Sequence, residues 1–327
     1  MTGVREEAGP LHGDGTGSPD FPGEDKAARA DAWLAERFEE HRGRLRAVAY
    51  RMLGSLDEAD DAVQEAWVRF SAAGADEVVN LGGWLTTIVS RVCLNILRAR
   101  AARPESLAGA RVPDPVLSPA DGPTPEQEAL LADSVGLALL VVLDTLTPAE
   151  RVAFVLHDVF DVPFGEIALM LGRTAQASRQ LASRARQRVK AAGTRQPDAA
   201  VAAQRAVIDA FFAAARAGDL ATLVELLDPD VVLRTDGFAG FPTLIQGADA
   251  VSSATLGGAS PHAEFHPVLV NGAAGVLVTM RGRPAALMAF TVVAGRITAV
   301  DGITDPRRVR RLVSSEPLRR TGAVFRG

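Results

Sequence analysis

Two segments early in the chain carry charged and amide side chains at helical spacing. The first, DEADDAVQEAWVRF, has apolar residues on one face and Asp57, Asp61, Gln64 and Glu65 on the other. The second begins at Trp84 and brings Arg91, Asn95 and Arg98 together at spacings of four and three residues. Arginines beside a rigid aromatic suit the phosphates and bases of single-stranded nucleic acid. Taken alone, neither segment is decisive, because charges on one side are typical of the solvated face of an ordinary amphipathic helix.

A third segment, residues 146–190, has the pattern of a helix-turn-helix. A short helix over Phe164–Leu171 is predicted to end at Gly172, and Thr174 is expected to cap the next helix. The second helix and its approach carry side chains of the types that contact base edges and phosphates in a major groove. These are Arg173, Thr174, Gln176, Ser178, Arg179, Gln180, Ser183, Arg184 and Arg186. Six basic residues and no acid lie between Gly172 and Lys190, which strengthens the DNA-binding interpretation.

The elements that position these residues are predicted to be helices and loops as far as residue 192. Apolar periodicity predicts helices over 31–53, 57–70, 84–100 and 126–145. Thr147, Pro148 and Glu150 form a helix start with a capping box.

The last third is predicted to be α+β. Helices are expected over 199–217 and 219–227, and strands over Val231–Arg234, Glu264–Val270, Val276–Met280, Ala285–Val293 and Arg296–Val300. Several of these strands are joined by Asn-Gly or Ala-Gly turns.

Composition supports folded domains and excludes several classes of protein. The chain has 327 residues, is 47% hydrophobic and has a formal net charge of −5, so it is not a uniformly basic nucleic-acid coat. The single cysteine, Cys93, excludes an intramolecular disulfide framework and a cysteine-built zinc site. Neither a membrane span nor a secretory signal is apparent, so we expect a cytoplasmic protein without a membrane partner. Glycine and proline predict a disordered leader over 1–30 and an extended linker over 104–125.

The first two segments together resemble region 2 of the extracytoplasmic-function (ECF) sigma factors. The matching residues are Asp61-x-x-Gln64-Glu65, Trp84-Leu85, Arg91 and Leu97-Arg98 within 31–103. The resemblance implies that Asp57, Asp61, Gln64 and Glu65 bind the clamp helices of the RNA polymerase β′ subunit. It also implies that Trp84, Arg91, Asn95, Arg98 and Arg103 hold the melted −10 strand, from which a base is flipped out. Asn95 stands where many relatives have Asp.

Residues 126–192 resemble sigma region 4, which binds the −35 element and the polymerase β flap. The stretch GEIALMLGRTAQASRQLASRARQRV is similar to the SigJ-like group, whose members carry a long C-terminal extension. The implied partners are therefore core RNA polymerase and promoter DNA.

Residues 199–312 form the third expected domain, followed by a basic tail to residue 327. Residues 201–300 resemble the SnoaL-like, NTF2-like family, which implies a cone-shaped sheet with helices closing one side. The expected fold is thus multidomain, with two all-α sigma domains followed by an α+β cone. Tethered to the promoter-binding domains, the cone is expected to regulate them in cis. The expected contacts are the linker's Pro113, Asp114 and Pro115, the turn at Asp236 and Gly237, and Asp305, Pro306 and Arg308.

Two alternatives remain open at this point. A polyketide-cyclase-like enzyme fused to a DNA-binding module would use an acid in the cone, and Asp236 is the nearest candidate, although Asp before Gly is more often a turn residue. His262 and His266 alternate on a predicted strand without a matching carboxylate, which makes a poor metal site. A plain helix-turn-helix repressor would need neither of the first two segments. We expect no catalytic residue, metal or cofactor, and leave open a small ligand in the cone.

Overall fold

A computed structural model describes residues 23–73, 80–102, 112–124, 127, 136–191, 200–237, 243–258 and 260–314. The first helical domain consists of α1 (Gly23–Leu53), α2 (Leu56–Ala73) and α3 (Leu81–Ala101). Helix α1 begins at Gly23, so part of the predicted disordered leader is helical. Aromatic rings tie the bundle together, since Phe70 lies 6.1 Å from Phe38 and 5.8 Å from Trp84 between ring centroids. Within the described residues, each helix is too short or too polar to cross a membrane.

The second helical domain contains α5 (Leu137–Asp144), α6 (Pro148–Phe154), η2 (Val155–Val159), α7 (Phe164–Leu171) and α8 (Ala175–Ala191). The capping box at Thr147 and Glu150 is confirmed, with Pro148 at the first helical position. Of the helix predicted over 126–145, the structure describes Gln127, which is helical, and α5, which covers Leu137–Asp144. Most of 125–135 lies outside the described residues.

The C-terminal domain, here called the cone domain, confirms the predicted α+β class. It contains α9 (Val201–Ala217), α10 (Leu220–Leu226), β2 (Leu227–Thr235), β3 (Thr243–Gln246), α11 (Ala248–Gly257), β4 (Ala263–Val270), β5 (Ala273–Met280), β6 (Arg283–Val293), β7 (Arg296–Ile303) and α12 (Pro306–Val313). The Asn271-Gly272 turn between β4 and β5 has φ values of 50° and 78°, as a tight hairpin turn of this kind requires. Strand β3 and helices α11 and α12 were not predicted, and α12 carries four of the arginines near the C-terminal end of the chain.

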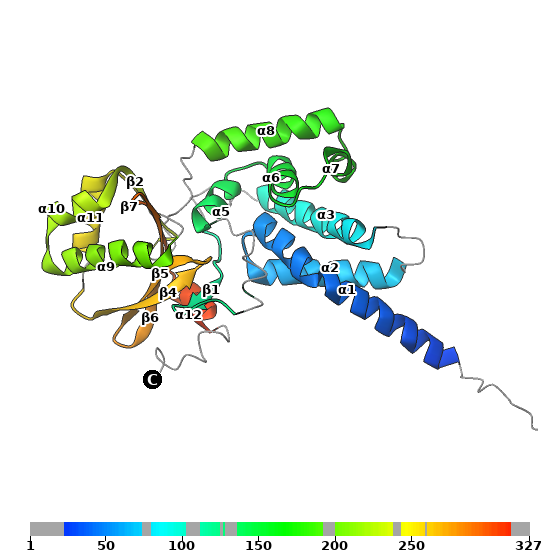
Figure 1. Cartoon of the computed structure of the whole chain (residues 1–327), viewed down its shortest axis with the longest axis horizontal. Coiled ribbons are helices and arrows are strands. Elements are labelled where there is room, and N and C mark those ends of the chain that lie inside the picture. Colours follow the sequence, from blue (N-terminus) through cyan, green and yellow to red (C-terminus); the bar gives the residue numbers. More distant parts are fainter. Residues whose placement is uncertain are drawn as a thin grey trace, which may run out of the picture.

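The linker between the helical domains contributes a strand to the cone domain, contrary to the prediction of helix and loop alone before residue 192. Strand β1 (Leu117–Pro119) pairs antiparallel with β4, with Leu117 opposite Val270 and Pro119 opposite Val268. Strand order is β1-β4-β5-β6-β7-β2-β3, so the linker forms an edge of the described sheet. Proline is tolerated there because an edge strand leaves one side unpaired. Figure 1 shows β1 beside α12 and the cone strands, far in sequence from both.

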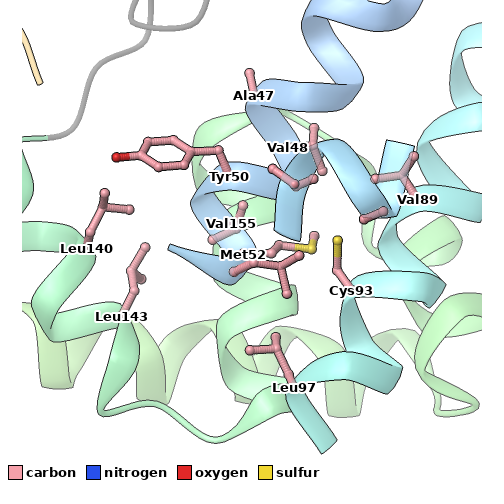
Figure 2. Close-up of a cluster of buried hydrophobic side chains, with 14 of the residues drawn as sticks. Ala47, Val48, Tyr50, Met52, Val89, Cys93, Leu97, Leu140, Leu143 and Val155 are labelled. Carbon is pink, nitrogen blue, oxygen red and sulfur yellow. The ribbon is translucent and has the colours of Figure 1, made fainter. Parts of the chain in front are cut away.

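The two faces of the sheet pack against different parts of the chain. One face packs with α9, α10 and α11 around Phe211, Phe212 and Phe290. Leu277, Leu287 and Ile303 on the other face belong to a core that also contains α12, the linker and both helical domains. Figure 2 shows part of that core, where Met52, Cys93 and Leu97 of the first helical domain meet Leu143 and Val155 of the second. The helical domains therefore pack directly on one another.

Candidate polymerase, DNA and interdomain interfaces

The acidic face of α2 is solvent-exposed as predicted. Asp57, Asp61, Gln64 and Glu65 are all exposed, whereas the other side of the helix buries residues such as Ala62. Glu65 pairs with Arg69 one turn away, and Asp57 lies 3.7 Å from the Nε atom of Arg311 in α12. Most of this face is thus open to solvent, with α12 touching one end.

Helix α3 carries a polar face opposite its buried one. Arg91, Asn95 and Arg98 are exposed, while Val92, Leu94 and Leu97 are buried. The side chain of Asn80 accepts a hydrogen bond from the Gly83 amide at 3.0 Å and so fixes the start of α3, beside Trp84. Trp84 is partly buried, and its ring meets that of Phe70 edge to face. Arg103 and the loop residues 74–79 lie outside the described residues.

The second helix of the helix-turn-helix, α8, is set by Gly172 and Thr174 as predicted. Gly172 adopts φ 65°, and the Thr174 hydroxyl oxygen accepts a hydrogen bond from the Ala177 amide at 3.1 Å. The exposed residues here are Arg173, Thr174, Gln176, Arg179, Gln180, Arg184 and Arg186, while Ser183 is partly buried. The Arg186 guanidinium lies 2.7 Å from the Asp158 carboxylate, whose pKa is raised by burial. Arg186 is thus paired with a residue of its own domain, the second helical domain.

The prediction for Ser178 is wrong. Its side chain is fully buried and its hydroxyl donates a hydrogen bond to the Thr174 carbonyl at 3.1 Å. Ser178 shares the inner stripe of α8 with Ala182 and Ala185, at spacings of four and three residues, where the helix packs on α6. A small polar residue at such a position fills space in the core and cannot reach a DNA base.

Arg308 of α12 joins the linker to the cone domain. Its Nε atom donates to Asp114 at 2.6 Å, its Nη1 atom to Asp236 at 3.2 Å, and its Nη2 atom to the Val112 carbonyl. Asp114 also accepts from Arg311 at 2.9 Å, and Asp236 from the Thr304 amide at 2.6 Å. The predicted contact joins the linker, the Asp236 turn and the segment that forms α12. It is present as a partly buried ionic cluster.

The remaining predicted interdomain residues have supporting positions. Pro113 and Pro115 are buried beside Asp114, and Gly237 is buried with φ 79°. Asp305 caps α12 by accepting from the Arg307 amide at 2.8 Å, and Pro306 is the first residue of that helix.

A second interdomain contact was missed from the sequence. The Tyr50 hydroxyl of α1 lies 2.9 Å from the Asp114 carbonyl and 3.2 Å from the Asn271 side-chain oxygen. Asn271 also exchanges hydrogen bonds with the Val116 backbone, at 2.7 and 2.9 Å. Burial raises the pKa of Tyr50 far above its ordinary value, so the phenol remains protonated as a donor. The sequence marked Asn271 only as a turn residue, since nothing local indicates its partner.

The geometry defines two helical domains with exposed acidic and basic faces, the second of them a helix-turn-helix, and a cone domain bound to their linker. Residues 37–103 match the family described as Sigma-70 region 2, and residues 136–189 match Sigma-70, region 4. Both helical domains are therefore of the sigma-70 class.

Similarity to known proteins extends over most of the chain. The chain is 38% identical over 284 residues to the ECF RNA polymerase sigma factor SigJ of Mycobacterium tuberculosis, covering 82% of this chain and 91% of the relative. It is 36% identical to a probable ECF sigma factor, SigI, of the same species, covering 84% and 92%. The crystal structure of SigJ superposes with a TM-score of 0.66 and 36% identity, covering 84% of this chain and 97% of that one. The chain belongs to the ECF RNA polymerase sigma factor family, and its function is that of a sigma factor rather than an enzyme.

Proposed function

We propose that the three exposed faces divide the work of promoter recognition and that the cone domain controls it in cis. The acidic face of α2 binds the β′ clamp helices of core polymerase, Arg91, Asn95 and Arg98 of α3 bind the melted −10 strand, and α8 enters the major groove at −35. The second helical domain also binds the β flap of core polymerase. The exposure and charge of these faces support the assignment.

The regulatory part of the proposal rests on one observation, the binding of the linker by the cone domain. Residues 112–119 lie between the first helical domain and the cone domain, with β1 in the cone's sheet and Asp114 held by Arg308 and Arg311. Helix α3 packs on α6 and α7, and these in turn carry α8. Packed helices lie about 8–10 Å apart, so α3 and α8 are separated by about 20 Å.

This spacing does not fit a promoter. By their names the −35 and −10 elements lie about 25 base pairs apart, or about 85 Å along B-form DNA. A closed molecule can therefore contact one element but not both. Polymerase has to separate the helical domains, and every contact between the cone domain and the linker opposes that separation.

The structure disfavours an enzymatic cone. Its interior is packed with aromatic rings, since the ring centroids of Phe212 and Phe265 lie 4.3 Å apart and those of Phe212 and Phe290 5.8 Å apart. Asp236, the candidate acid, is bound to Thr304 and Arg308 at the interdomain contact. On β4, the Glu264 carboxylate lies 3.7 Å from the His266 ring. That pair lies on the opposite side of β4 from Phe265, the residue that packs into the cone.

Run-off transcription with core polymerase tests the regulatory proposal. The full chain should transcribe less than a chain ending at Arg195 or one ending at Thr304, because both shortened chains lack α12. Circular dichroism should first show that the helical content expected for each chain is retained. Equal transcription from all three would rule out regulation in cis and favour a ligand-binding role for the cone.

Arg179→Ala should relax or abolish preference for the −35 sequence while leaving binding to a pre-melted −10 bubble intact. Arg179 is exposed on α8, and its guanidinium lies 5.6 Å from the centroid of the Phe164 ring. An arginine that reads guanine contributes about 1–3 kcal/mol of discrimination. Competition between matched and mutated −35 duplexes measures the loss, and Arg91→Ala should give the converse result. Lost bubble binding with an unchanged −35 preference would reverse the two assignments.

A further inference from the structure

Arg151 is a buried cation at the junction of the two helical domains. It lies in α6, and its side chain is 2% exposed. Its Nη1 atom donates to the Asp144 carboxylate at 2.5 Å, and its Nη2 atom donates to the Arg51 carbonyl of α1 at 3.4 Å. Arg151 therefore carries its charge from the second helical domain into the first.

The site that receives Arg151 is the C-terminal end of α1. Carbonyl groups at a helix end lack partners within the helix and carry partial negative charge, so they attract cations. Arg100 meets the same end through the Leu53 carbonyl at 3.0 Å. Gly54, which follows with φ 69°, accepts a hydrogen bond from the Asp114 amide at 2.8 Å. A side-chain carbon at Gly54 would lie 3.5 Å from Nη2 of Arg151, so the first helical domain, the linker and the second helical domain meet here.

The apolar surroundings of Arg151 make its charge costly to bury without a counterion. Met52, Cys93, Leu143 and Val155 belong to the apolar core around the junction, and Figure 2 shows Val155 and Cys93 next to Met52. A charge in such a place is tolerated only when a counterion and hydrogen bonds satisfy it. Asp144 supplies the counterion.

We propose that Arg151 is a latch that holds the second helical domain shut on the first, and that Asp144 sets the strength of the latch. In the closed molecule Asp144 compensates the charge of Arg151 inside the core. In the open molecule Arg151 is hydrated and needs Asp144 much less. Weakening the pair therefore shifts the equilibrium toward the open form. The biological meaning of the latch rests on the proposed function, because opening is what lets α3 and α8 span a promoter.

The native cysteine reports opening without polymerase or added labels. Cys93 is fully buried at the junction, and burial raises the pKa of its thiol to about 12, while the nearby charge of Arg151 lowers it. Because only the thiolate reacts, a maleimide reagent at pH 8 labels Cys93 through transient opening. The labelling rate is then proportional to the opening constant.

In the full chain, Asp144→Asn should raise the labelling rate of Cys93 about tenfold or more. The Asn side-chain oxygen can still accept from Arg151 but no longer neutralises its charge, which is buried only in the closed form. Glu150→Gln is the matched control. It removes a carboxylate of the next helix that lies 3.0 Å from Arg188 within the same domain, and Gln preserves the capping box. The control should label within about twofold of the parent chain, because Glu150 and Arg188 both belong to the second helical domain and their contact is the same in the closed and the open molecule.

Two results would overturn the latch. The first is an unchanged labelling rate in Asp144→Asn, or an increase no larger than the change in its global unfolding constant in urea. The second comes from exchanging the pair, Asp144→Arg with Arg151→Asp, which restores the ion pair but removes the donor to α1. If the exchanged variant labels as slowly as the parent chain, the pair serves only its own domain. Continued fast labelling supports the latch, and none of these results depends on the transcription assay.

Discussion

A chain carrying Asp61→Arg and Glu65→Arg is expected to lose affinity for core RNA polymerase by about a hundredfold or more while remaining folded. Both side chains are exposed on α2, and surface substitutions usually change the free energy of unfolding by only about 0.5 kcal/mol. Placing two positive charges against a basic partner replaces attraction by repulsion, which costs several kcal/mol. Pull-down of core polymerase, or fluorescence anisotropy with the labelled sigma factor, measures the loss.

The matched control for that variant is Asp209→Arg with Glu225→Arg. These two exposed acids lie on α9 and α10 of the cone domain, so the change in net charge is identical but the position is different. Binding by the control should stay close to that of the parent chain. If the α2 variant still binds core polymerase normally, the acidic face is not the polymerase contact.

The second large effect is expected from Arg308→Met. Arg308 faces Asp114 and Asp236, whose side chains are 5% and 13% exposed, so its loss leaves two carboxylates short of positive charge. Removing one partner from a buried ionic cluster costs about 3–5 kcal/mol, with Arg311 limiting the loss at Asp114. The linker should therefore separate from the cone domain more readily, and transcription by the full chain should rise.

Arg310→Met controls for the loss of one arginine from the same helix. Arg310 lies on the exposed side of α12. Its removal should therefore leave the contact between the linker and the cone domain, and the level of transcription, unchanged. Limited proteolysis of the linker measures its separation from the cone domain. Thermal unfolding, measured in parallel, shows whether either variant has lost overall stability. Equal cleavage rates for the two variants would show that the Arg308 cluster does not hold the linker.

Features that depend on neighbouring residues, such as helix caps, tight turns and the polar faces of helices, could be predicted from the sequence alone. Thr147 and Glu150 cap a helix because they lie three residues apart, Gly172 ends one because it adopts a positive φ, and Asn271-Gly272 closes a hairpin for the same reason. The acidic and basic faces of α2 and α3 follow from helical periodicity. Resemblance of these motifs to ECF sigma factors then indicated the polymerase and promoter partners.

How the domains are joined depends on contacts between segments that lie far apart in the chain. Strand β1 has three residues and exists because β4, about 150 residues later, offers an edge. Nothing in the neighbouring sequence marks Arg151 or Tyr50, and their roles arise from the Arg51 carbonyl and Asn271, which folding brings to them. Ser178 belongs to an inner stripe because α6 covers that side of α8. Local periodicity specifies which faces a helix has, but the partner of a face is set by packing between distant segments, which no short stretch of sequence encodes.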